Sequence, residues 1–513
     1  MNKNNRLIYI LALLKFILPF VLVPSFYQAH RDEYLYMTEG KHLAWGFMEV
    51  PPMLAILAWI NHFFGEGLFL IKFWPAIFGA GTFILTARIV SSLGGKTFAI
   101  LLAFLPFIFT GYIRLFYLFH PNFLDAFFWT LNAYALFYFI NTTKNSWLYL
   151  FGISVGLGMM SKYSTAFYTL SLLAGLVFSQ HRTIFLNKHL YFGGILALCI
   201  FFPNMYWQYK HQFPVIAHMK ELQEEQLQFQ SPIKFIIGQL LMLLPCLFLW
   251  LRGLLYLLFN KKGSSYRIFG LAYLFVITLL IFLQGKDYYA IGAYPILIAF
   301  GSYQFEQYAI NRSAFVKYSP IAICILLGLF IYPLLLPIAN PALLSAYYQK
   351  TGLNKSGAFE WEDHKKHTLP QDFADMLGWR EVAIATGKVY QSLSLEEQKN
   401  TMVYCRGYYF AGALNYYAKE AGLPEVYSDN ASFLIWMPKK YQIKNLLVLA
   451  HNIPEKDDVV FQQFEKMTVK DSLINPYFRE SGIKIILYQN GNDSLNSYIE
   501  KGIATQRLKF NLQ

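Results

Sequence analysis

The chain has 513 residues, of which 56% are hydrophobic and 14% are charged. Soluble domains carry about 25% charged residues, so the composition excludes an ordinary soluble protein and indicates extensive contact with lipid. The formal net charge is +13. Nucleic acid is nevertheless not an expected partner, because membrane proteins collect Lys and Arg in their cytoplasmic loops, and no basic cluster with interleaved aromatic residues occurs.

Apolar runs of about 20 residues, enough to cross a bilayer as helix, recur through the first two thirds of the chain. The first run, Leu7 to Ser25, is predicted to be a retained span, because it ends without a small-residue cleavage pattern and further apolar runs follow. Two amphipathic segments, 33–46 and 51–64, are predicted to lie along the membrane interface. We predict eleven transmembrane helices, at 7–25, 67–90, 97–113, 121–140, 147–161, 163–180, 190–208, 233–259, 268–284, 289–308 and 315–338.

Lys and Arg are more frequent in the loops on the side of the amino terminus than in the loops on the other side. Cytoplasmic loops are enriched in Lys and Arg, so this asymmetry predicts a cytoplasmic amino terminus and places everything after residue 338 outside. We therefore predict a transmembrane domain at 1–340 and an extracytoplasmic domain at 341–513.

The second domain has charges throughout and follows a linker at 350–368 that is rich in Gly, Lys and His. Residues 409–421 are predicted to form a helix that ends at Gly422. Strands that alternate with helices are typical of a small α/β layer. Three apolar segments are predicted to form short buried strands: Val403–Cys405, Leu446–Leu449 and Ile483–Tyr488.

The densest polar cluster follows the first span and comprises His30, Arg31, Asp32, Glu33, Glu39, Lys41, His42 and Glu49. Charged groups beside a hydrophobic phase are costly and often functional. Asp32 could instead be the N-cap of a helix, and Glu33 a first-turn acid favoured by the helix dipole. For Asp32 the two roles are compatible, because a capping carboxylate keeps lone pairs to offer.

Other charged residues are predicted at the same face of the membrane. Asp125 opens the fourth span, and Lys162 and Lys286 stand at the outer ends of later spans. Asp125 could pair structurally with Arg114 or His120, and lysines at span ends often only extend to the interface. Carboxylates and cations from distant segments nevertheless converge on one face, and helix bundles commonly build their sites in this way.

The order and spacing of these motifs resemble the superfamily of dolichyl-phosphate-mannose protein mannosyltransferases and aminoarabinose lipid A transferases, of the GT-C fold. Bacterial members of this group are often labelled glycosyltransferase family 39. The matching elements, in chain order, are Asp32-Glu33, Glu49-x-Pro-Pro, Asp125, Ser161-Lys162-Tyr163, the loop 203–218, Gly285-Lys286-x-Tyr288-Tyr289, Tyr294-Pro295, Gln371 to Met376, Gly378-Trp379 and Gly422-Leu423-Pro424.

The resemblance implies a polytopic α-helical membrane protein of GT-C type with a C-terminal extracytoplasmic α/β domain, in a bacterial cytoplasmic (inner) membrane. It implies an inverting glycosyltransferase that takes a hexose or pentose from a polyprenyl-phosphate carrier held among membrane lipids, without a nucleotide sugar. The acceptor stays open among a lipid such as lipid A, a cell-envelope glycan and a protein.

The family places its catalytic carboxylate in the first outer loop, which here maps to Asp32, with Glu33 beside it. Cleavage of a glycosyl phosphate builds positive charge on the sugar and negative charge on the phosphate. A carboxylate can accept the proton of the acceptor, and Lys or Arg can stabilise the leaving phosphate. The phosphate candidates are Lys162, Lys286, Arg31 and Arg114, and the substrate-positioning candidates are Glu49, Asp125, Tyr288 and Tyr289.

No cofactor is certain from the sequence. Some relatives carry a divalent metal ion near the residues that match Asp32 and Asp125, so a metal ion on these two carboxylates stays open. A transporter or flippase of lipid-linked sugars is the main alternative function, but no pairing of halves is evident and the polar residues cluster at one face. A non-catalytic membrane scaffold is the third alternative.

Overall fold

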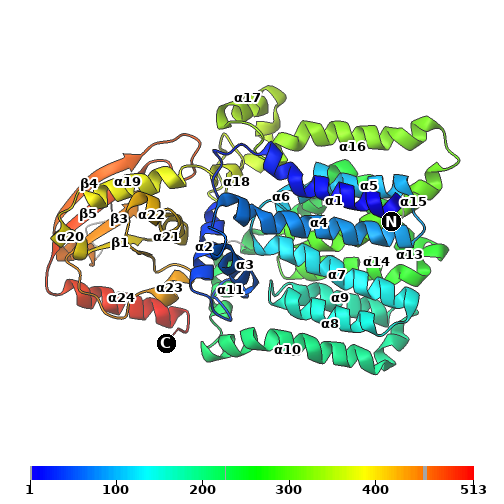
Figure 1. The fold of residues 1–513 in the computed structure, drawn as a ribbon, viewed down its shortest axis with the longest axis horizontal. Coiled ribbons are helices and arrows are strands. Elements are labelled where there is room, and N and C mark those ends of the chain that lie inside the picture. Colours follow the sequence, from blue (N-terminus) through cyan, green and yellow to red (C-terminus); the bar gives the residue numbers. More distant parts are fainter. Residues whose placement is uncertain (1–2, 226, 454–458, 513) are drawn as a thin grey trace.

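The computed structural model describes residues 3–225, 227–453 and 459–512. Figure 1 shows a bundle of roughly parallel helices with a smaller α/β domain against one of its ends. The amino-terminal end of α1 (Lys3–Leu22) lies at the other end of the bundle. The predicted fold class, a helical membrane domain followed by a small α/β domain, is confirmed.

Helices form in all eleven predicted spans. Among the described residues, six helices are long and apolar enough to cross a membrane, or seven if the pair α12 (Pro232–Met242) and α13 (Leu247–Phe259), bent by 68°, counts as one span. The six lie within α1, α4 (Leu68–Ser92), α7 (Pro121–Thr142), α10 (Lys188–Lys210), α14 (Arg267–Phe282) with the turn before it, and α16 (Ala314–Leu335).

The four remaining predicted spans contain helices of only 13 to 16 residues, shorter than the about 20 that a full span needs. Their apolar sequence continues into turns instead: α15, for example, follows the 3-10 helix η5 (Asp287–Ala293). In Figure 1 these shorter helices run alongside the long ones. They are α5 (Thr97–Phe109), α8 (Ser146–Met159), α9 (Thr165–Val177) and α15 (Tyr294–Ala309).

Two short helices, α2 (Arg31–Lys41) and α3 (Met53–His62), follow the first span and lie between the bundle and the α/β domain (Figure 1). A capping box starts α2: the imidazole of His30 accepts a hydrogen bond from the amide of Asp32, and the carboxylate of Glu33 accepts one from the amide of His30. Residues 33–40 are all buried. The two predicted amphipathic segments thus form helices at the end of the bundle, and α2 is in addition buried beneath the α/β domain.

The α/β domain contains one five-stranded sheet with the order β2-β1-β3-β5-β4. Strands β2, β1 and β3 are parallel, with Val403 opposite Leu447. Strand β5 runs antiparallel to both of its neighbours, β3 and β4, with Leu447 opposite Leu487. The three predicted strands correspond to β1, β3 and β5. The strands are β1 (Thr401–Cys405), β2 (Val426–Tyr427), β3 (Asn445–Ala450), β4 (Phe464–Leu473) and β5 (Ile483–Gly491).

Each face of the sheet has its own core. Val403 and Cys405 pack in the cluster that continues into the membrane bundle, whereas Met402 and Leu446 pack with Ile499 of α24. The predicted helix at 409–421 is present in two pieces and ends at Gly422, whose positive φ of 65° suits glycine. The helices of the domain are α19 (Trp379–Gln391), α20 (Leu395–Lys399), α21 (Tyr408–Tyr416), α22 (Ala418–Ala421), α23 (Phe433–Trp436) and α24 (Leu495–Lys509).

Helix α21 packs directly on α2 and joins the two parts of the molecule. A Cβ at Gly412 of α21 would lie 2.9 Å from the backbone of Tyr34, so only glycine allows this approach. The ring of Tyr34 contacts the rings of Trp379 and Tyr416. This packing places the first residues of α21 beside the first residues of α2. The remaining helices are α6 (Tyr112–Leu115), α11 (Pro214–Glu225), α17 (Pro341–Thr351) and α18 (Gln371–Ala374).

Candidate functional site

The predicted site residues lie around the end of the bundle that faces the α/β domain. Asp32 stands in the first turn of α2, and its Oδ1 accepts a 2.6 Å hydrogen bond from the hydroxyl of Tyr408, the first residue of α21. The Nε of Arg31 lies 3.3 Å from the same oxygen. Burial alone would raise the pKa of Asp32, but Arg31, the two nearby histidines and Tyr408 hold it well below its usual range. Asp32 is therefore an ionised carboxylate.

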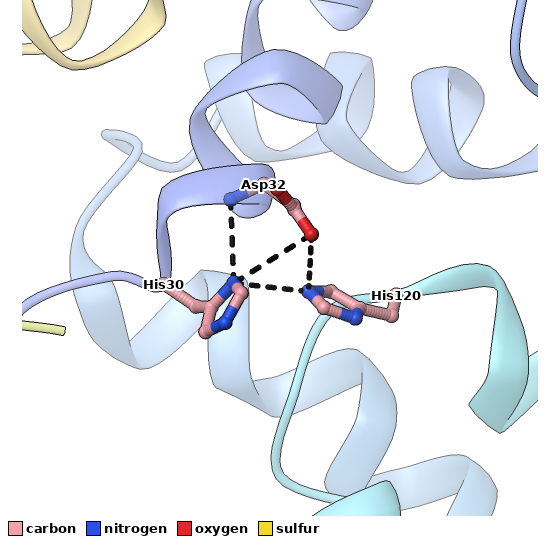
Figure 2. A group of neighbouring side chains, drawn as sticks. All are labelled: His30, Asp32 and His120. Atoms are coloured by element: carbon pink, nitrogen blue, oxygen red, sulfur yellow. Dashed lines mark hydrogen bonds and ion pairs between the residues drawn. The ribbon is translucent and has the colours of Figure 1, made fainter. Parts of the chain in front are cut away.

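Two imidazoles face the other oxygen of Asp32, as Figure 2 shows. Nε2 of His120 lies 3.8 Å and Nδ1 of His30 4.0 Å from Oδ2, and the two ring nitrogens are 3.2 Å apart. Burial lowers the pKa of His30, but Asp375 and Asp32 outweigh this effect and raise it overall. Burial and the charge of His30 lower the pKa of His120 to about 4. At neutral pH His120 is therefore the neutral member of the pair.

The neighbouring Glu33 has a different environment. Both of its oxygens lie 2.6 Å from Nζ of Lys72 in α4, and it also accepts hydrogen bonds from the amides of His30 and Phe119. Glu33 and Lys72 are 0% and 2% exposed. The predicted catalytic role of Glu33 is not compatible with these contacts, because its carboxylate is fully enclosed by protein donors. We assign Glu33 to holding the start of α2 on the bundle.

Arg31 and Arg114, both predicted to bind the donor phosphate, are instead engaged by carboxylates of the second domain. NH1 of Arg114 binds Asp372 at 2.7 Å, and its other nitrogens donate to the carbonyls of Leu334 and Leu335 at the end of α16. NH2 of Arg31 lies 3.4 Å from Glu362. These guanidinium groups hold the two parts of the molecule together, which leaves them few donors for a phosphate.

A buried acidic residue completes this interface. Asp375 is 0% exposed and lies 3.5 Å from Nε2 of His30 and 3.1 Å from NH1 of Arg479. Arg479 also binds Glu362 at 2.9 Å. Asp375 therefore orients the ring of His30 from the side opposite to Asp32.

The predicted lysines form a second group. Nζ of Lys162, in the turn between α8 and α9, donates to Oδ1 of Asn122 at 2.7 Å and lies 4.2 Å from the ring centroid of Tyr289. Asp125 lies 4.0 Å from the same ammonium and accepts hydrogen bonds from the hydroxyls of Ser164 and Thr165. Lys162, Asp125 and Tyr289, which are far apart in sequence, are thus brought together.

Lys286 belongs to the same region. Burial lowers the pKa of the Lys162 ammonium, Asp125 opposes this, and the positive charge of Lys286 lowers it further. Lys286 also lowers the pKa of Glu362, the carboxylate shared by Arg31 and Arg479. The charge of Lys286 therefore acts both on Lys162 and on the carboxylate that Arg31 binds. Tyr288 and Tyr289, in the turn after Lys286, pack edge to face with ring centroids 4.9 Å apart.

Glu49, a predicted positioning residue, contacts the α/β domain. Its two oxygens accept hydrogen bonds of 2.6 Å from the amide and the hydroxyl of Ser432, just before α23. The carboxyl of Glu39 is 0% exposed, and burial together with Glu49 raises its pKa well above the usual value. Its burial therefore favours the neutral, protonated form of Glu39. Glu49 therefore links the loop after α2 to the second domain. It takes part in none of the Asp32 contacts described above.

His30, Asp32 and His120 form the one group of three residues, within the described part of the chain, whose ligand atoms could converge on a metal ion. The ligand atoms lie within 4.8 Å of one another. Two imidazole nitrogens and one carboxylate oxygen suit zinc and similar transition metals. Asp125, the other residue predicted to hold a metal ion with Asp32, lies in the lysine group, where it contacts Ser164, Thr165 and Lys162.

Several residues of the site were missed from the sequence. Lys72 interrupts an apolar span, and an ionisable residue in such a position is a signal that could have been used. Tyr408, Asp375 and Arg479 lie more than 340 residues from Asp32 along the chain, and no periodic pattern relates them to it. The contact between α2 and α21 brings Tyr408 to Asp32, and a backbone hydrogen bond from the amide of Arg31 to the carbonyl of Asp375 brings Asp375 beside it.

Comparisons with known proteins agree with the fold. Residues 49–207 match the family model described as dolichyl-phosphate-mannose-protein mannosyltransferase. No curated protein matches the chain by sequence. The structure of ArnT from Cupriavidus metallidurans is similar in the apo state, with a TM-score of 0.61, 12% identity and coverage of 94% of this chain and 97% of that chain.

The same protein bound to undecaprenyl phosphate matches with a TM-score of 0.60, 12% identity and the same coverage. The oligosaccharyltransferase of Archaeoglobus fulgidus in complex with Zn and sulfate matches with a TM-score of 0.50 and 13% identity, over 86% of this chain and 67% of that chain. At such identities the likeness concerns the fold. The chain has the GT-C fold, and its resemblance to this superfamily is confirmed.

Proposed function

We propose that this protein is a glycosyltransferase that moves a sugar from a polyprenyl-phosphate carrier to an acceptor at the outer face of the membrane. The observation that carries this proposal is the position of Asp32, an ionised carboxylate between an imidazole pair and a buried tyrosine hydroxyl, at the end of a membrane bundle. The matching family model and the GT-C fold support transferase chemistry. The similar ArnT structure with bound undecaprenyl phosphate supports a lipid-phosphate donor.

In the proposed reaction the acceptor attacks the anomeric carbon while the bond from that carbon to the phosphate oxygen breaks. A single displacement of this kind inverts the configuration and needs one base on the acceptor side. Asp32 fills this role: it accepts the acceptor proton and offsets the positive charge that grows on the sugar. Tyr408 and Arg31 hold the carboxylate in place.

The leaving phosphate needs positive charge on the opposite side of the sugar. Lys162 and Lys286 supply it in the proposal, because the positive charge of Lys286 is close enough to lower the pKa of the Lys162 ammonium. A bound phosphate relieves this repulsion. Tyr289 and Asn122 hold the Lys162 side chain. Asp125, which accepts a hydrogen bond from Ser164, lies 4.0 Å from the Lys162 ammonium.

The low pKa of Asp32 bears on the choice of acceptor. A carboxylate with a pKa far below neutrality is a weak base, and proton transfer to it is efficient only late in the reaction. A lipid A phosphate as acceptor requires no strong base, and Asp32 then orients the nucleophile. A glycan or protein hydroxyl as acceptor requires Asp32 to accept a proton.

The group of His30, Asp32 and His120 is also proposed to hold a divalent metal ion. Asp375, beside Nε2 of His30, would fix the ring so that Nδ1 faces the ion, as carboxylates do for many metal-bound imidazoles. Bound there, a metal ion would supply positive charge beside Asp32. Metal content measured by mass spectrometry on the purified protein and on His120→Asn tests this, because loss of a ligand should lower the bound metal.

The proposed location is a bacterial cytoplasmic membrane, with the α/β domain outside. The lysine and arginine asymmetry of the loops supports this orientation.

The donor is tested with the purified protein in lipid and labelled polyprenyl-phosphate sugars. The expected result is release of free polyprenyl phosphate and transfer of the label. Transfer from a nucleotide sugar alone, in lipid that contains no polyprenyl carrier, would contradict the proposal.

A further inference from the structure

The residues around Asp32, namely His30, His120 and Tyr408, form the Asp32 group with it. The α/β domain contains a cavity of about 460 Å³ whose lining includes none of these residues. It extends along the face of the sheet covered by α24, above Met402, Tyr404 and Leu446. At one end it reaches Arg406, which follows β1, and Phe461, which lies between β3 and β4. Ligand pockets commonly have volumes of about 300–1,000 Å³, so the cavity is large enough for a small molecule.

The position of the cavity in the sheet is one where α/β proteins bind ligands. The chain leaves β1 to reach β2 on one side and later returns to β3 on the other side of β1. The loops after β1 and β3 therefore diverge. In open α/β sheets ligands bind at this switch point, outside the carboxyl ends of the strands.

The lining combines two kinds of surface. Met402, Leu446 and Ile499 form an apolar wall, while Asp429, Asn430 and Gln506 provide polar groups. Oδ1 of Asp429 accepts a 2.6 Å hydrogen bond from the hydroxyl of Tyr404, and both residues line the cavity. Carboxylates and amides present two adjacent polar atoms, which matches the spacing of neighbouring hydroxyls on a sugar ring. The C–H face of such a ring suits an apolar wall.

The charge of the lining narrows the ligand class. Among the described residues that line the cavity, Arg406 is the one cation, and Asp429 stands beside it in the same lining. Phosphate sites gather several cations or backbone amides at a helix start. A neutral, hydroxyl-rich ligand fits this lining better than a nucleotide or a lipid phosphate.

The cavity is linked to Asp32 through one residue. Oδ1 of Asn430, in the cavity lining, accepts a hydrogen bond of 3.3 Å from the backbone amide of Tyr408. The hydroxyl at the other end of Tyr408 donates to Asp32. The cavity rim and Asp32 are thus separated by the length of one tyrosine side chain.

We propose that this cavity binds a saccharide unit of the acceptor and so presents the acceptor to the Asp32 group. That the saccharide belongs to an acceptor rests on the proposed transferase function, whereas the binding of a saccharide does not. Asp429, Asn430 and Gln506 bind its hydroxyls, and Tyr408 couples its presence to the position of Asp32.

Gly502→Phe is designed to place a ring at the lining of the cavity with little disturbance of the fold. Gly502 of α24 lines the cavity, and a Cβ added there meets no atom within 4 Å. Gly502→Phe therefore adds a ring without a clash at its Cβ, and it replaces a glycine in a helix, which favours the helix. Lys501→Phe, at the exposed neighbouring position, is the matched control.

Binding is measured on the full-length protein in lipid nanodiscs by saturation-transfer NMR. The probes are free glucose, galactose, mannose, glucosamine and N-acetylglucosamine, without donor. We expect saturation transfer to at least one sugar with the wild type and Lys501→Phe, and a signal lower by at least about tenfold with Gly502→Phe. No transfer to any sugar in the wild type, or equal transfer in Gly502→Phe, would overturn the inference.

A second readout separates this inference from the proposed function. Release of polyprenyl phosphate from the labelled donor tests the transferase, and saccharide binding without donor tests the cavity. If both hold, Gly502→Phe should raise the KM for acceptor and leave donor binding at the wild-type level. An unchanged acceptor KM in Gly502→Phe would overturn the acceptor role of the cavity.

Discussion

The hydroxyl of Tyr408 donates a 2.6 Å hydrogen bond to Oδ1 of Asp32, across 376 positions of the chain. One residue belongs to the α/β domain and the other to the helix that follows the first membrane span. The proposed base is therefore completed by the second domain. Tyr408→Phe, which removes only the hydroxyl, is expected to lower turnover by roughly tenfold, since a hydrogen bond to a charged group contributes about 1.5–3 kcal/mol. Turnover of the purified variant checks this, and wild-type turnover would show that the contact is only structural.

The Glu33–Lys72 pair predicts a large effect on stability. Lys72→Met leaves a buried carboxylate without its cation, and removal of one partner of a buried pair costs about 3–5 kcal/mol. We expect a lower midpoint of thermal unfolding, with partial recovery in the double variant Glu33→Gln, Lys72→Met. Lys41→Met is the control, because the Lys41 ammonium is exposed and lies 3.6 Å from Glu66. If Lys72→Met were as stable as Lys41→Met, the structural role of the Glu33–Lys72 pair would be contradicted.

Lys162 and Lys286 are expected to act on the donor phosphate. Replacement of either lysine by Met keeps the apolar stem and removes the charge, so donor binding or turnover should weaken by at least about tenfold. Two lysines on one phosphate should lose less together than the sum of their separate losses. Donor titration of each variant measures this. Lys144→Met, at an exposed position between α7 and α8, is the control, and lysine variants that match it would place the phosphate elsewhere.

The pair Glu39 and Glu49 predicts a pH-dependent stability. The pKa of Glu39 is raised in the folded protein by burial and by Glu49, so the folded state binds more protons than the unfolded state above the ordinary pKa of 4.5. The free energy of unfolding should therefore fall as pH rises from that value towards the raised pKa. Glu39→Gln removes this dependence and should be more stable than the wild type at pH 7 but not near pH 4. Thermal unfolding at both values checks it; equal stability at pH 7 would contradict it.

The predicted orientation places the α/β domain on the outer face of the membrane. Ser392, just after α19, is exposed, and a single cysteine placed there in a cysteine-free variant should react with a membrane-impermeant reagent in intact cells. A cysteine at Lys144, at the opposite end of the bundle, should react only after the cells are opened. The reverse pattern would place the α/β domain and the Asp32 group inside.

Local patterns predicted much of the fold. Apolar length identified the positions of the membrane helices, and short β-rich runs such as Val403–Cys405 identified strands of the sheet. The amphipathic pattern of 33–46 predicted the helix α2 but not its burial, which results from the contact of Tyr34 with Gly412. That contact joins elements far apart in the chain, and periodicity carries no information about it.

The candidate site was predictable only in part, because sequence patterns identify charged residues but not their distant partners. Asp32, Asp125, Lys162 and Lys286 stood out because charged residues are rare near apolar spans. Their partners decided their roles. Glu33 resembles Asp32 in sequence, but Lys72 encloses it, and Arg114 resembles a phosphate ligand, but Asp372 already binds it.

The central claim, that Asp32 is the base of a polyprenyl-phosphate-dependent transferase, is tested most directly by one substitution. Asp32→Asn keeps the shape of the side chain and removes its charge, and Asp363→Asn, at an exposed carboxylate, is the control. With labelled donor and a hydroxyl acceptor, Asp32→Asn should fold normally and turn over roughly 10²–10⁴-fold more slowly than the wild type. Near-normal turnover of a well-folded Asp32→Asn protein would contradict the account.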